Sequence, residues 1–308
     1  MAFEHTWRWF GPDDPISLNE IKQTGATGIV TALHHIPVGE VWPVEEILKR
    51  KNIIEKHGFE WSVVESLPVH EGIKKGNSES PALIEDYRQS IRNLSECGIR
   101  TICYNFMPVL DWSRTGLGVK TNDGAITTKF ESKAFAAFDL YILKRPGAEK
   151  DYSSAMLKDA ERIFENMSKT EKAELTNTIL LGLPGSMETL TLDEFKEAVL
   201  EYNSLGEQRV RANLYYFIQE VMPVAEESGV LMAIHPDDPP WKLLGLPRVA
   251  GTKQDMEAIL AAYDSPSNGI TFCAGSFGAG YSNDLADMVR AFASRINFVH
   301  LRSLIRDR

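Results

Sequence analysis

Three residues with metal-binding side chains occupy corresponding points of three similar segments in the last third of the chain: His235, Cys273 and His300. A thiolate beside two imidazoles favours Fe²⁺, Mn²⁺, Co²⁺ or Zn²⁺ over Mg²⁺, because soft ligands select softer cations. A single buried His or Cys is more often a packed core residue than a ligand. The same position in three successive segments, however, indicates a divalent metal site.

Each of these residues ends a short apolar run that is typical of a strand buried on both faces of a sheet. The runs cover 230–235, 269–273 and 297–300, and they are rich in β-branched or aromatic residues and bounded by turn-forming residues. Segments of helical period separate them. If the three strands are consecutive and parallel in one barrel, their carboxyl ends lie at the face where such barrels keep their chemistry. We therefore expect the three side chains to converge.

The same pattern occurs earlier in the chain, so strands and helices alternate along much of its length. Strands are predicted over 28–35, 59–66, 99–106, 230–235, 269–273 and 297–300. Helices are predicted over 18–23, 44–56, 82–96, 133–143, 154–167, 169–181, 192–203, 207–227, 252–263 and 282–294. A glycine stands at or just before the start of most of these strands: Gly28, Gly58, Gly98, Gly229 and Gly269. A glycine at this place can adopt the left-handed conformation that ends the preceding helix. Right-handed crossovers between successive strands then imply a parallel sheet or barrel.

The fold class that follows is α/β, a TIM-type (β/α)8 barrel with about six of its eight βα units present. Residues 1–308 are predicted to form a single barrel domain. Because six strands would leave such a barrel open, the domain is expected to be C-terminally incomplete. A mostly helical insertion and lid is expected over 108–207, after the third strand, since long interruptions of a compact domain are usually functional or mobile.

Composition limits the partners of the chain. Its net charge is −10 without a basic run, which argues against nucleic acid as a partner. No apolar run approaches the roughly 20 residues that a membrane span needs, and the first residues lack the basic and apolar parts of a signal peptide. The odd number of cysteines, three, suits free thiols in a reducing compartment. A cytoplasmic location is therefore predicted, with no membrane partner.

Two smaller features bear on the predicted site. Arg302 follows His300 by two residues, so it shares a strand face with it and is expected to pair with the carboxylate of an anionic substrate; a surface ion pair is the alternative. Gly275, Gly278 and Gly280 lack the spacing of a dinucleotide-binding motif. They predict a loop whose backbone approaches a ligand or a neighbouring segment closely.

Long motifs in both halves of the chain resemble those of the mannonate dehydratase family, and the likeness covers essentially the whole length. The motifs are TWRWFGP at 6–12, GIVTALHHIP at 28–37, GEVWP at 39–43, YNFMPVLDW at 104–112, IHPDDPP at 234–240, CAGS at 273–276 and VHLR at 299–302. The resemblance implies a metal-dependent barrel that dehydrates D-mannonate to 2-keto-3-deoxy-D-gluconate in hexuronate (glucuronate) catabolism, with Mn²⁺ or Fe²⁺ as cofactor.

The family's functional residues carry over to several positions of this sequence. By resemblance, His235, Cys273 and His300 match three metal ligands, and the substrate-binding residues are His34, Asn105 and Arg302. A fourth ligand, an aspartate, and the adjoining acid/base histidine are expected beyond Arg308, so no catalytic residue is assigned within the chain. A homo-oligomer, a dimer, is expected.

Two other functions stay open on the sequence alone. A metal-dependent sugar isomerase of the same barrel type is one, although such sites usually use carboxylate-rich ligands and the cysteine counts against it. A truncated fragment that retains metal but is inactive is the other.

Overall fold

The chain, described by a computed structural model over residues 3–181 and 190–306, divides into two compact units. Unit 1 comprises Met1–Phe106, Gln208–Pro240 and Val249–Arg308, and unit 2 comprises Met107–Glu207 and Trp241–Arg248. Among the helices of the described residues, none combines the length and apolar character that a membrane crossing needs.

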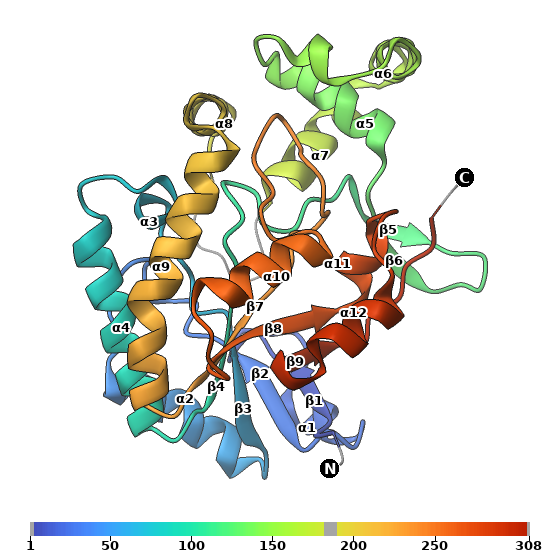
Figure 1. The fold of residues 1–308 in the computed structure, drawn as a ribbon. Helices are drawn as coiled ribbons and strands as arrows, with labels where there is room; N and C mark the ends of the chain where they lie inside the picture. Colours follow the sequence, from blue (N-terminus) through green and yellow to red (C-terminus); the bar gives the residue numbers. More distant parts are fainter. Residues whose placement is uncertain (1–2, 182–189, 307–308) are drawn as a thin grey trace. The chain divides into compact units, whose positions relative to one another are not determined.

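Unit 1 is built on a parallel sheet of seven strands in the order β1-β2-β3-β4-β7-β8-β9 (Figure 1). The strands are β1 (Thr6–Arg8), β2 (Gly28–Thr31), β3 (Glu60–Glu65), β4 (Thr101–Tyr104), β7 (Leu231–Ile234), β8 (Asn268–Cys273) and β9 (Ile296–His300). All residues of β2 and β8 are buried, because helices cover one face of the sheet and its own side chains fill the other. This double burial is why the strands are continuous apolar runs in the sequence.

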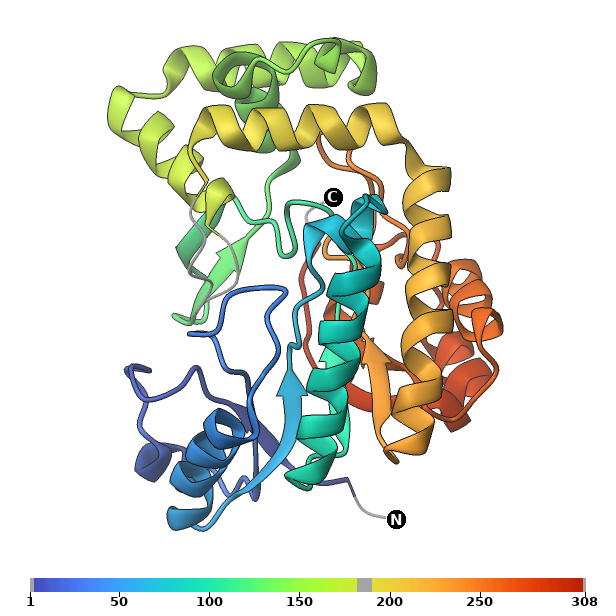
Figure 2. The ribbon, with the colours of Figure 1, turned by 90° about the vertical axis from the view of Figure 1, so that its left-hand side faces the viewer.

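The helices of unit 1 lie between and beside these strands. They are α1 (Leu18–Lys22), α2 (Val44–Lys56), α3 (Glu71–Lys75), α4 (Ser80–Glu96), α9 (Glu207–Glu227), α10 (Lys253–Ala262), α11 (Ala274–Ala279) and α12 (Leu285–Phe292). Helices α4 and α9 run side by side (Figures 1 and 2), where Arg88 Nε donates to the Glu220 carbonyl at 2.7 Å. These helices, 110 or more residues apart in the sequence, therefore form one wall against the sheet.

The glycines that precede the strands serve two different purposes. Gly58, Gly98 and Gly229 have φ values of 78°, 83° and 61°, the left-handed conformation expected at a helix end. For Gly28 and Gly269 the expected left-handed conformation is wrong, since neither residue has a positive φ. A Cβ there would lie within 2.2 Å of a side-chain atom on the neighbouring strand, so these two are glycine because of crowding.

The sheet curls strongly, so that its last strand faces its first ones. Phe298 of β9 packs against Val30, Val63 and Cys103, which belong to β2, β3 and β4. In the order of hydrogen-bonded strands, β9 is separated from β4 by β7 and β8. Side chains from distant strands therefore meet inside the curve.

Three further features of unit 1 differ from the sequence-based expectations. The sheet has seven strands instead of six, because β1 was missed. Its sequence, Thr-Trp-Arg, is too short and too polar to form an apolar run, yet Thr6 pairs with Gly28 in the ladder. The glycines after Cys273 lie in or beside the short helix α11 rather than in a loop, and helix α3 was also missed.

Unit 2 is mostly helical and also contains a small antiparallel hairpin. Its elements are β5 (Gly116–Lys120), β6 (Ile126–Lys129), α5 (Ser132–Ala137), a π-helical segment (Phe138–Leu143), a 3-10 turn (Ala148–Asp151), α6 (Ser154–Asn166), α7 (Lys169–Leu180) and α8 (Leu192–Leu205). Arg145, between the two, pairs with Asp139 of the π-helical segment at 2.7 Å and with Asp151 of the turn at 2.6 Å, and so links them. The hairpin was not predicted, because most of its residues are exposed and show no apolar alternation.

Candidate metal centre

The structure brings His235, Cys273 and His300 together at the carboxyl ends of β7, β8 and β9. His235 directly follows β7, whereas Cys273 and His300 are the last residues of their strands and are partners in the ladder. One ligand atom of each residue lies within 4.8 Å of those of the other two. The two imidazole rings have centroids 5.1 Å apart. This donor set of two nitrogens and one sulfur fits a transition-metal ion, in line with the predicted role of the three residues.

Cys273 and His300 share charge within this cluster. Burial raises the pKa of Cys273, but hydrogen bonds from His235 and His300 outweigh it and lower the value to about 5. Burial lowers the pKa of His300, but its bonds to Cys273 and Glu65 outweigh this and raise the value to about 9. At neutral pH the sulfur is therefore a thiolate, balanced by protons on imidazole that a divalent cation would displace.

Glu65, the last residue of β3, contacts the cluster and was not identified from the sequence. Its Oε2 lies 3.3 Å from His300 Nε2 and 2.9 Å from Arg8 Nη1. Although burial raises the pKa of Glu65, the hydrogen bond to His300 and the charge of Arg8 hold it well below its usual range. The sequence did contain a signal for Glu65: it is a charged residue at the end of a buried strand, the same kind of position that the cluster residues occupy.

Arg302 is held beside the cluster by a buried carboxylate. Its Nη2 donates to Asp238 Oδ2 at 2.6 Å and lies 3.3 Å from Ser276 Oγ. Ser276 Oγ is also 3.1 Å from Cys273 Sγ, so a short chain of polar contacts links Arg302 to the cluster. A Cβ on Gly275 would lie only 2.0 Å from Arg302 Nε. Glycine at this place is what leaves room for the guanidinium group.

His34 and Asn105, the other predicted substrate-binding residues, follow the ends of β2 and β4. Both are half-buried. His34 Nε2 is buried and has no hydrogen-bond partner, which leaves it available to a bound hydroxyl group. The structure thus places both residues after sheet strands, as it does the cluster, while their binding role stays a prediction.

The buried state of His34 gives the protein a measurable pH dependence. Burial, and then the nearby charges of Arg8 and Arg50, lowers the pKa of His34 from 6.5 to about 4. The folded state therefore keeps this imidazole neutral where the unfolded chain protonates it, so its contribution to stability is complete above pH 6.5 and is lost as the pH falls towards 4. Between pH 7 and pH 5 we expect this group to cost about 2 kcal/mol of unfolding free energy.

Urea unfolding at a series of pH values checks this expectation. His34→Gln should lose less stability than the wild type between pH 7 and pH 5, because Gln does not titrate. His5→Gln, which changes an exposed histidine, is the control and should follow the wild-type curve. Parallel curves for wild type and His34→Gln would show that His34 is not held neutral.

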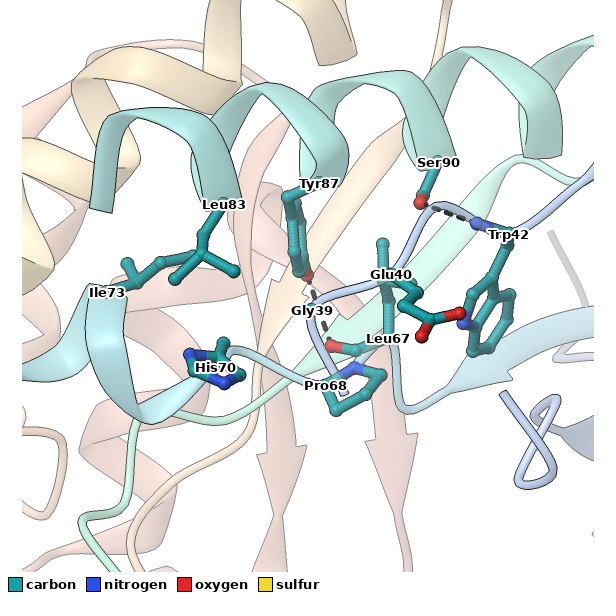
Figure 3. Close-up of a pocket in the computed structure, with 10 residues that line it drawn as sticks. All are labelled: Gly39, Glu40, Trp42, Leu67, Pro68, His70, Ile73, Leu83, Tyr87 and Ser90. Atoms are coloured by element: carbon teal, nitrogen blue, oxygen red, sulfur yellow. Dashed lines mark hydrogen bonds between the residues drawn. The ribbon is translucent and has the colours of Figure 1, made fainter. Parts of the chain in front are cut away.

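A separate small pocket lies between α4 and the segments before α2 and α3 (Figure 3). Its lining includes Glu40, His70 and Tyr87, and Tyr87 Oη donates to the Leu67 carbonyl at 3.2 Å. The free space is at the lower limit for one water molecule. None of the predicted site residues lines this pocket, so the metal cluster remains the candidate functional site.

Known proteins similar to this chain identify its family. The profile of the D-mannonate dehydratase (UxuA) family matches residues 3–308. Mannonate dehydratases of Marinomonas sp. (strain MWYL1) and Chromohalobacter salexigens are each 53% identical over 304 residues, which are 99% of this chain and 78% of the relative. The crystal structure of mannonate dehydratase from Streptococcus suis serotype 2 has a TM-score of 0.76 at 37% identity, and the match covers 97% of this chain and 73% of that one. The resemblance of the motifs is thereby confirmed, and the chain belongs to the mannonate dehydratase family.

Proposed function

We propose that this protein dehydrates D-mannonate to 2-keto-3-deoxy-D-gluconate, with a divalent metal ion held by His235, Cys273 and His300. The observation that carries the proposal is the convergence of these three side chains at one edge of the sheet, in a chain of the mannonate dehydratase family. Their nitrogen and sulfur donors favour Mn²⁺ or Fe²⁺ over Mg²⁺. The pathway that this activity would serve is hexuronate catabolism.

The reaction explains why such a cluster is needed. Taking a proton from the carbon beside a carboxylate creates a second negative charge, and a divalent cation held by His235, Cys273 and His300 would stabilise that charge. Loss of the 3-hydroxyl then requires a proton donor.

Other residues of the chain would bind and orient the substrate. Arg302, held in place by Asp238, would pair with the sugar carboxylate through its guanidinium group. His34, neutral at pH 7, can hydrogen-bond a hydroxyl group through its buried Nε2. Asn105 would supply a further polar contact after β4. These groups distinguish a sugar acid from a neutral hexose, because only the acid pairs with the guanidinium group.

Three wider features belong to the same proposal. The curled parallel sheet is taken to be the wall of a TIM-type barrel, since its strands are all parallel and its chemistry lies at their carboxyl ends. Within this proposal the protein is cytoplasmic, acts on a small sugar acid and assembles as a homodimer. Analytical ultracentrifugation checks the assembly.

The test is an assay of metal-depleted protein to which Mn²⁺, Fe²⁺ or Mg²⁺ is added. We expect 2-keto-3-deoxy-D-gluconate to form from D-mannonate with Mn²⁺ or Fe²⁺ and far more slowly with Mg²⁺. Fructose and glucose, incubated in parallel, should not interconvert. Interconversion of the free hexoses without turnover of mannonate would instead support a sugar isomerase.

A further inference from the structure

The two histidines of the cluster are held by different kinds of partner through different ring nitrogens. His235 Nδ1 lies 2.7 Å from the carbonyl oxygen of Pro236. A carbonyl oxygen only accepts hydrogen bonds, so Nδ1 carries the hydrogen. The lone pair of a neutral His235 is then on Nε2, and that nitrogen is the one able to bind a metal ion.

His300 has the opposite arrangement. Its Nε2 lies 3.3 Å from Glu65 Oε2. The same Oε2 is paired with the Arg8 guanidinium group at 2.9 Å, and a carboxylate in such an ion pair only accepts hydrogen bonds, so Nε2 of His300 carries the hydrogen. When a metal ion displaces the second proton of His300, Nδ1 is therefore the nitrogen whose lone pair becomes available. The contact with Glu65 thus selects one of the two tautomers of His300.

Glu65 is itself held in place from a third strand. The guanidinium group of Arg8, on β1, contacts the same oxygen that faces His300, at 2.9 Å. The other oxygen, Oε1, lies 3.8 Å from the thiol of Cys103 on β4. The Glu65 side chain is 16% exposed, so water competes little with these contacts. Glu65 therefore has one defined orientation.

We propose that Glu65 is a positioning residue that makes His300 bind the metal ion through Nδ1 while His235 binds through Nε2. The inference rests on the proposed metal site, and it adds a residue and an atomic assignment to it. Carboxylates that hydrogen-bond a metal-binding histidine fix the orientation of its ring and raise its basicity. Losing such a partner typically lowers metal affinity by about 10- to 100-fold.

Glu65→Gln tests the role of the carboxylate because Gln has the same shape without the charge. Its amide can either accept from or donate to His300 Nε2, so both tautomers become possible. Mn²⁺ affinity, measured by titration of metal-depleted protein, should fall by about 10- to 100-fold. Glu60→Gln, an exposed position on the same strand, is the matched control and should keep wild-type affinity.

A second readout reports on the nitrogens directly, and its main measurement is made on the wild-type protein. In the Zn²⁺-loaded wild type, two-bond ¹H–¹⁵N correlation spectra should show hydrogen on Nδ1 of His235 and on Nε2 of His300. His235→Gln and His300→Gln assign the signals. In Glu65→Gln the His300 pattern should become mixed or reversed.

The outcomes separate this inference from the proposed function. Wild-type protein that binds Mn²⁺ and turns over mannonate, but carries hydrogen on the same nitrogen of both histidines, would overturn the inference alone. Wild-type Mn²⁺ affinity in Glu65→Gln would also overturn it. Failure of the wild type to bind Mn²⁺ through the cluster would overturn both the metal site and the inference.

Discussion

Cys273→Ser is expected to abolish most Mn²⁺ binding and, with it, mannonate turnover. The sulfur is a thiolate at neutral pH, and it lies with the two imidazoles in one cluster. A serine hydroxyl at the same place stays protonated and is a weak ligand. Since the loss of a residue that merely hydrogen-bonds a ligand costs about 10- to 100-fold in affinity, the loss of the ligand itself should cost more than about 100-fold.

Elemental analysis of purified protein after dialysis against a fixed Mn²⁺ concentration measures this effect. Cys97→Ser is the matched control, because Cys97 is also a free, buried cysteine but ends α4 outside the cluster. It should retain wild-type occupancy. Equal occupancy in Cys273→Ser and the wild type would rule out the thiolate as a ligand.

Arg302→Lys is expected to lower kcat/KM for mannonate by about 10- to 100-fold while leaving Mn²⁺ affinity near the wild-type value. Arginine presents several N–H groups in a planar fork, so it can pair with Asp238 and with a substrate carboxylate together. Lysine keeps the positive charge but has only one ammonium group. The charge alone should not restore the fixed orientation that the substrate needs.

Steady-state kinetics and metal titration of the same preparation separate this effect from loss of the metal. Arg290→Lys, an exposed position on α12, is the control and should behave as the wild type. Unchanged kcat/KM in Arg302→Lys would remove Arg302 from the binding site. A parallel loss of Mn²⁺ affinity would mean that the residue acts through Ser276 on the cluster instead.

The strands of the core could be predicted from the sequence because burial on both faces leaves a local signature. Helix α2 (Val44–Lys56) has the predicted bounds, and β8 ends at Cys273 as expected. Strand β1 and the hairpin of β5 and β6 have no such signature, since their residues are polar or exposed. The pairing of β1 with β2 and of β5 with β6 therefore leaves no apolar pattern from which it could be predicted.

The same distinction explains what could be predicted of the site. His235, Cys273 and His300 end neighbouring strands, so one rule about parallel strands was sufficient to expect their convergence. Glu65 ends a strand that is not a neighbour of β9 in the sheet. Its contact with His300 exists because the sheet curls, and no local pattern reports the amount of curl. The lid role of 108–207 stays a prediction.

The curled sheet also determines when the site can form during folding. Glu65 and His300 are 235 positions apart in the sequence, whereas His235 and Cys273 are much closer. Contacts between distant positions carry the largest loop-closure cost and are made slowly. The contact that orients His300 is therefore made late, so a metal ion meets the fully oriented ligand set only when folding is nearly complete. Interactions that are absent from the folding transition state lower the unfolding rate and leave the folding rate unchanged. Bound metal should therefore slow unfolding without speeding folding.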